Sequence, residues 1–158
     1  MKTQGMRIVE FGFSVDEILK CVFAESAWRA LRDKDANKRP AIITEDNRIV
    51  LEFMMQDAYV NICSRFIGYI NAYDFRSIDT GIMTLSLAIP EQLDSLLDSI
   101  LQKRIEHAMT CYVLYMCYDT EGYSVASDEY HQRYSTAINS VRGSLTSPTT
   151  ARITLNWL

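Results

Sequence analysis

Two histidines are the residues whose type could support acid–base or nucleophilic chemistry. His107 follows Glu106, and His131 is followed by a glutamine and an arginine. A nucleophile needs a base within hydrogen-bond reach, yet neither histidine belongs to a local Ser or Cys signature, and no G-x-S-x-G segment is present. A solvated or hydrogen-bonded structural histidine is therefore the favoured interpretation, and a small helical enzyme using His107 or His131 with a nearby carboxylate is the weakest alternative.

Three acidic residues are the candidates for a metal site. Asp94 and Asp98 are four residues apart, so they share one face of a helix, and Glu91 is near them. The first turn of a helix favours acidic side chains without any metal, because of its positive dipole end. H-E-x-x-H, C-x-x-C and EF-hand patterns are absent, and the glycines are scattered singly rather than gathered in a phosphate-binding loop. We therefore predict no metal, no cofactor and no enzymatic activity.

The four cysteines form no C-x-x-C pair or other recognisable metal-binding or redox motif. Each lies among apolar residues, where a free thiol behaves as a small hydrophobic side chain. The cysteines are Cys21, Cys63, Cys111 and Cys117. We expect buried free thiols in a reducing compartment, with a disulfide or a metal site as the minor alternative.

The composition indicates one folded domain with an acidic balance. The chain has 158 residues, of which 48% are hydrophobic, and its net charge of −4 argues against broad nucleic-acid binding. The apolar stretches are too short or too interrupted for a signal peptide or a membrane span. The densest basic stretch consists of Arg29, Arg32, Lys34, Lys38 and Arg39. A solvated helix end and linker is the simpler explanation, and a phosphate-facing patch is the alternative.

Hydrophobic periodicity predicts a mainly α fold: a bundle of about four helices with a small β element. Residues 1–13 form an extended N-terminal arm, and residues 149–158 form a C-terminal strand or tail of the single domain 1–158. The helices are expected at 14–33, with Ser14 as N-cap, at 48–70, from Pro90 to just before Gly122, and from Ser124 or Ser127 to 145. Alternation predicts strands near 82–89 and 152–158. The segment 71–81 between helix and strand is expected to be a loop. Such short strands must pair with each other, with the arm, or with another chain.

Apolar surface remains after each helix has been given one inward face. The helix 14–33 carries a second stripe on its far side, and the helix 48–70 is apolar around most of its circumference. Surplus apolar surface is typical of contacts with other chains, although in a compact fold these faces could all point at one another. The residues predicted for a subunit or partner interface are Cys21, Trp28, Leu31, Leu85, Leu87, Ile153, Leu155 and Trp157.

The element order resembles that of the small head–tail connector (adaptor) proteins of tailed bacteriophages. In that family a long helix leads through a short acidic turn with a glycine into a tyrosine-bearing last helix. The matching residues are Leu93, Leu96, Ile100, Ala108, Cys111 and Tyr115, followed by Tyr130, Tyr134, Ala137, Ile138, Val141, Arg142 and Leu145. They cover about a third of the chain, and the remainder is similar only in the order of its elements.

The resemblance implies a structural virion protein, assembled in the bacterial host cytoplasm. It would form a ring of identical subunits, about twelve-fold in symmetry, between the portal protein and the next neck or tail protein. The ring would continue the DNA channel, with non-specific phosphate contacts from Arg29, Arg32, Lys34, Lys38 and Arg39. The segments 82–89 and 152–158 would then pair across subunits or with the portal. The rival interpretation is a stand-alone helical interaction or regulatory module that forms a dimer.

Overall fold

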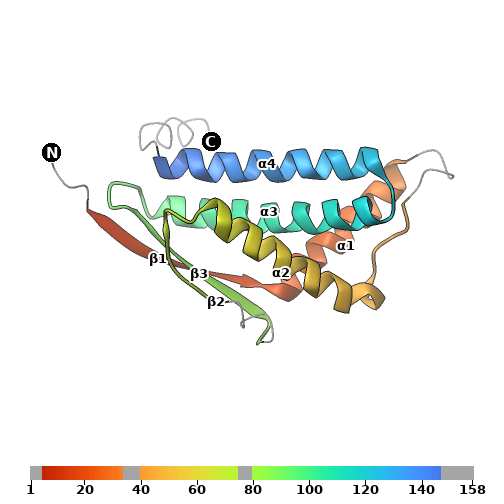
Figure 1. Cartoon of the computed structure of the whole chain (residues 1–158), viewed down its shortest axis with the longest axis horizontal. Coiled ribbons are helices and arrows are strands. Elements are labelled where there is room, and N and C mark those ends of the chain that lie inside the picture. Colours follow the sequence, from red (N-terminus) through yellow and green to blue (C-terminus); the bar gives the residue numbers. More distant parts are fainter. Residues whose placement is uncertain (1–4, 34–39, 75–79, 147–158) are drawn as a thin grey trace.

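The computed structural model describes residues 5–33, 40–74 and 80–146 (Figure 1). Over these residues the chain forms four long helices, one short 3-10 turn and a three-stranded antiparallel sheet. The order is β1 (Met6–Ser14), α1 (Val15–Arg32), η2 (Glu45–Asn47), α2 (Arg48–Arg65), β2 (Ile70–Asp74), β3 (Ile82–Pro90), α3 (Leu96–Thr120) and α4 (Ser124–Thr146). The mainly α fold with a small β element is confirmed, and the predicted strand at 152–158 lies outside the described residues.

The sheet is built around β3. The strand order is β1-β3-β2, and β1 pairs with β3 along its whole length, from Met6 opposite Pro90 to Ser14 opposite Ile82. The predicted extended arm is therefore an edge strand. Alternation places Phe11, Phe13 and the odd-numbered residues of β3 in the core.

The central place of β3 corrects two predictions. Leu85 and Leu87 were expected at a subunit interface, but both side chains are fully buried in the core. The resemblance also implied that this strand pairs across subunits or with the portal, yet the N-terminal arm, one of the partners considered for it, occupies one of its edges as β1, and β2 occupies the other over Thr84–Leu87. Because hydrogen-bonding groups on both sides are already used, β3 is not a docking strand.

Three element boundaries also differ from the prediction. The helix expected over 48–70 ends at Arg65, and the segment expected to be a loop contains β2, which bulges between Ile70 and Ala72. Pro90 ends β3 rather than starting a helix, and α3 begins only at Leu96. Two local signals are confirmed: the Ser14 hydroxyl accepts a hydrogen bond from the Glu17 amide at 3.3 Å, and Gly122 has a φ of 80°.

Helix α3 is the centre of the molecule. No residue from Ala108 to Tyr118 is exposed. Helix α4 runs antiparallel alongside α3, α1 and α2 also pack against α3, and the sheet lies on the side away from α4 (Figure 1). The three covering helices each bury one face on α3, which leaves their other faces available to solvent.

Two polar contacts fix the sheet to the helices. The hydroxyl of Tyr59 on α2 donates to the Thr84 carbonyl at 2.5 Å and accepts from the Asp74 amide at 3.1 Å, so one side chain joins α2 to both β2 and β3. On the opposite edge, Arg7 of β1 forms two hydrogen bonds with Asp98 of α3, at 2.6 and 2.8 Å. This bidentate pair sets the position of β1 against the first turn of α3.

The two faces of β3 give a direct test of this architecture. We expect Leu85→Ala to lower the free energy of unfolding by about 2–5 kcal/mol, because it opens a cavity in the core. Ile82→Ala is the matched control: its side chain is 52% exposed on the outer face, and its loss is expected to cost under about 1 kcal/mol. Urea unfolding followed by circular dichroism measures both values. Equal costs for the two variants would contradict the inward placement of Leu85.

Candidate interaction surfaces

The outer face of α1 carries an apolar stripe, as the sequence predicts. Cys21, Ala24, Trp28 and Leu31 are all exposed, and we call them the α1 stripe. Trp28 and Leu31 are 58% and 77% exposed. The opposite face of α1 supplies Ile18, Leu19 and Val22 to the core. Helix α1 therefore has an inner face that the fold uses and an apolar outer face for which the described residues supply no cover.

A second apolar stripe lies on α2. Ile49, Phe53 and Val60 follow one another at helical spacing and are exposed, Ile49 by 74% and Phe53 by 66%; we call them the α2 stripe. The sequence predicts a helix that is apolar almost all round, but these three residues were not among the predicted interface residues. The pattern that could have identified them is the helical spacing of three apolar residues on the face opposite Leu51, Met55 and Ile62.

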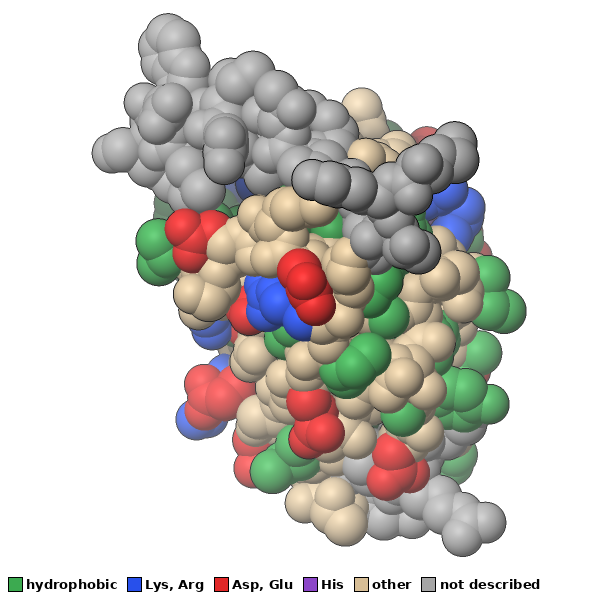
Figure 2. Space-filling view, turned by 90° about the vertical axis from the view of Figure 1, so that its left-hand side faces the viewer, with side chains coloured by type: hydrophobic (Ala, Val, Ile, Leu, Met, Phe, Trp, Pro, Cys, Tyr) green, Lys and Arg blue, Asp and Glu red, His purple; other side chains and the backbone are tan. Residues whose placement is uncertain are grey.

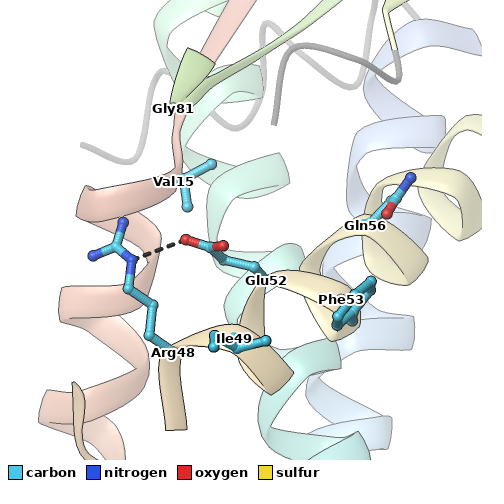
Figure 3. Close-up of a pocket in the computed structure, with 7 residues that line it drawn as sticks. All are labelled: Val15, Arg48, Ile49, Glu52, Phe53, Gln56 and Gly81. Carbon is cyan, nitrogen blue, oxygen red and sulfur yellow. Dashed lines mark hydrogen bonds and ion pairs between the residues drawn. The ribbon is translucent and has the colours of Figure 1, made fainter. Parts of the chain in front are cut away.

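A hollow of about 410 Å³ lies at the start of the α2 stripe (Figure 3). Helix α2 lines it with Arg48, Ile49, Glu52, Phe53 and Gln56, and Val15 and Gly81 form the opposite wall. The Arg48 guanidinium is held by Asp16 at 2.5 Å, by Glu45 at 2.9 Å and by Glu52 at 2.8 Å. Because three carboxylates surround one cation, the hollow is not suited to an anion, and its apolar rim favours a hydrophobic side chain of a partner.

The structure corrects the predicted DNA-contact patch at one of its five residues. Arg29 is buried, and its Nη1 atom lies 2.6 Å from Glu129 of α4. A guanidinium that is 90% covered and paired in this way stabilises the packing of α1 on α4 and is unavailable to a phosphate. Arg32 is exposed at the end of α1, and Lys34, Lys38 and Arg39 lie outside the described residues.

Charges on the surface in Figure 2 are interspersed rather than segregated. Acidic side chains are scattered over the described part of this face, basic side chains are fewer, and the described atoms in view form no continuous basic patch. Hydrophobic side chains gather along one edge of the same view. For the face shown, the surface is therefore better suited to apolar contact with a partner than to tight binding of a polyanion.

The histidines lie at the surface of the α3–α4 pair. His107 is exposed, and its Nε2 atom is 3.5 Å from the Cys111 sulfur. Burial raises the pKa of the Cys111 thiol to about 12, so the thiol stays protonated at neutral pH and is a poor nucleophile. His131 packs against the ring of Tyr115, with 4.9 Å between centroids. These contacts agree with structural roles for both histidines. The enzymatic alternative stays the weakest hypothesis.

The acidic residues near the start of α3 are used by the fold. Asp98 pairs with Arg7, and Asp94 accepts a hydrogen bond from the Leu96 amide at 3.0 Å. Within the described residues, no group of three or more His, Cys, Asp or Glu side chains is arranged to hold a metal ion. Within the same residues, no helix combines the length and the apolar character that a membrane crossing requires.

Comparisons with models of known protein families, with curated proteins and with solved structures give no match to this chain. Any functional conclusion therefore depends on the surfaces described above.

The Arg29–Glu129 pair predicts a pH dependence of stability. Partial burial acts to raise the pKa of Glu129, but the hydrogen bond from Arg29 and the charges of Arg29 and Arg133 outweigh it and hold the pKa below its usual 4.5. A lowered folded-state pKa contributes stability above pH 4.5 that is lost as the pH falls below it. We expect Glu129→Gln to destabilise the fold at pH 7, by about 1–3 kcal/mol, and its difference from the wild type to shrink as the pH falls below 4.5.

Urea unfolding at a series of pH values measures this effect. Asp128→Asn, a change at the neighbouring exposed residue of α4, is the matched control and should leave the curve unchanged. A constant difference between Glu129→Gln and the wild type across the pH range would contradict the assignment.

The cysteines predict a simple labelling pattern. The prediction of buried thiols is wrong for Cys21, which is exposed on the outer face of α1, and is confirmed for Cys63, Cys111 and Cys117. Burial raises the pKa of Cys117 to about 12. At concentrations at which it is monomeric, the folded protein should therefore react quickly at Cys21 alone with a chromogenic disulfide reagent at pH 8, and the other thiols should react after denaturation. Cys21→Ser should remove the fast phase. A fast phase that persists in this variant would mean that one of the buried thiols is accessible.

Proposed function

We propose that this chain is a subunit of a head–tail connector ring of a tailed bacteriophage, between the portal protein and the next neck or tail protein. The observation that carries the proposal is the presence of two separate apolar stripes, on α1 and on α2, exposed on one small domain. Both helices pack on α3 and make little contact with each other. The two stripes are therefore different surfaces, and a ring needs two different surfaces that fit each other.

Head-to-tail contact explains why both stripes are needed. In a cyclic assembly each subunit offers one surface to the neighbour on its left and another to the neighbour on its right. Trp28 and Phe53 are the largest exposed side chains of the two stripes, and buried aromatic side chains supply much of the energy of interfaces. We propose that Cys21, Trp28 and Leu31 of one subunit face the α2 stripe of the next.

A DNA channel through the ring places a second demand on the surface. A passage must let DNA slide, so its phosphate contacts must be few and weak rather than a dense basic patch. A chain with a net charge of −4 agrees with this demand. Because Arg29 is paired with Glu129, the residues proposed for non-specific contact with DNA phosphates are Arg32, Lys34, Lys38 and Arg39.

Native mass spectrometry over a concentration series, with negative-stain images of the largest species, tests the proposal. Closed rings are the expected result for the full chain. A dimer that stays fixed over the series would favour the alternative, a stand-alone interaction module. A chain that remains monomeric up to about 1 mM would have no self-affinity of functional size and would contradict ring formation.

Charge insertion into either stripe should prevent assembly. We expect Trp28→Glu and Phe53→Glu each to weaken subunit association at least about tenfold, because each would bury an unpaired carboxylate at the interface. Val125→Glu, at an exposed residue of the first turn of α4, is the matched control and should assemble normally. Sedimentation velocity measures the association. Full assembly by either stripe variant would remove that stripe from the proposed interface.

A further inference from the structure

The strand β1 has one open edge. It pairs with β3 on one side only, over nine residues, and no described strand lies on its other side. The open edge of a long strand is a template for pairing with another segment, so its backbone groups decide what it can accept.

The even-numbered residues of β1 direct their backbone groups to this edge. The Val15 amide donates to the Gly81 carbonyl, and hydrogen-bonded pairs alternate along an antiparallel ladder. The odd-numbered residues therefore bond to β3, and Met6, Ile8, Glu10 and Gly12 point away from it. In agreement, Gln102 of α3 donates to the Gly12 carbonyl at 3.0 Å. Toward the other end of the strand, Met6 and Ile8 present an amide and a carbonyl each to the open edge.

The side chains beside the open edge are apolar. Met6 and Ile8 are 48% and 55% exposed on the outer face of the sheet, and Ile82 of the neighbouring strand extends this surface. Glu10 is the charged residue of β1 on that face. An added strand with apolar side chains at alternate positions would cover Met6 and Ile8 while it pairs with their backbone.

The other edge of the sheet is less suited to such an addition. Strand β2 has only five residues, contains a bulge, and exposes the polar side chains of Asn71 and Asp74. Short, bulged and charged edges resist pairing. The open edge of β1 is therefore the better acceptor for a strand.

One segment of this chain has the matching pattern. Residues 152–157 alternate between Arg152, Thr154 and Asn156 on one side and Ile153, Leu155 and Trp157 on the other. This segment lies outside the described residues, and it follows α4, whose last residue is Thr146.

The end of α4 lies at the same end of the molecule as the start of β1 (Figure 1). Ser144 of α4 accepts a hydrogen bond from Arg104 of α3. Closer to the N-terminal end of α3, Asp98 pairs with Arg7 of β1. Residues 147–151 separate the end of α4 from the segment 152–157, and five residues in extended conformation span about 17 Å.

We propose that the open edge of β1 binds the segment 152–157 of a neighbouring copy as a fourth strand, with Ile153, Leu155 and Trp157 beside Met6 and Ile8. The choice of a neighbouring copy rests on the proposed function, since one donor and one acceptor per subunit give the head-to-tail contact that a ring requires. Backbone hydrogen bonds would supply most of the affinity, and the alternating side chains would set the register.

A proline on the edge separates pairing from folding. Ile8→Pro removes an amide that points away from β3, a position at which an edge strand accepts proline. We expect amides of residues 152–157 in the assembled full chain to exchange with deuterium at least about tenfold more slowly than an unstructured segment. Ile8→Pro should abolish this protection and leave the amides of α3 unchanged, whereas Ile8→Val, the matched control, should keep it.

Mixing two full-length variants identifies the source of the strand. Ile8→Pro has a blocked acceptor and Leu155→Asp a blocked donor, so protection of the segment should be absent in each alone. In a mixture, the segment of Ile8→Pro should regain protection on the edge of Leu155→Asp. Protection that persists in Ile8→Pro, or that mixing fails to restore, would overturn the strand exchange. Rings that form without protection of this segment would overturn the strand exchange and leave the connector proposal standing. Protection without rings would support the strand exchange and contradict the connector proposal.

Discussion

The need to cover α3 determines the rest of the structure. Eleven consecutive residues, from Ala108 to Tyr118, have no exposed side chain, so this part of the helix must be surrounded rather than packed on one side. Helices α1, α2 and α4 supply that cover together. A helix used as a cover needs only one apolar face, and α1 and α2 each carry a second one. The described residues leave this surplus on the two helices uncovered, and the proposed subunit contacts rest on it.

The sequence predicted what local signals determine. Periodicity located all four helices of the described chain, and Ser14 and Gly122 marked their ends correctly. The errors fall where long-range contacts override local preference. The segment Asn71–Asp74 is too polar for a convincing strand, and it pairs because Tyr59 anchors its end from α2. Pro90 is a good helix starter by type, but the ladder with β1 extends as far as Pro90 and delays the helix.

The candidate surfaces, like the helices, were predictable where a local signal determines them. Trp28 and Leu31 lie on the far side of an amphipathic helix, so their exposure followed from the helical period alone. Arg29 is adjacent to Trp28 in sequence, yet its side chain is buried because it pairs with Glu129, one hundred residues away. Leu85 and Leu87 looked like surplus apolar residues because no pattern in the sequence reveals that β3 is flanked on both sides. Exposure was thus predicted correctly where it is a property of one helix, and wrongly where it depends on a distant element.

The two edges of the sheet are unequally protected against pairing with another strand. Proteins commonly blunt an exposed edge with charge, a bulge or a short strand, since an open edge invites aggregation. Strand β2 uses all three devices. Strand β1 is nine residues long, has a single acidic residue facing outward, and has one edge carbonyl satisfied by Gln102. An edge left open beside Met6 and Ile8 is a hazard unless a specific segment occupies it, and the chain itself carries a segment of matching alternation. In the proposed ring, this edge and the two stripes would be the different surfaces that head-to-tail assembly requires.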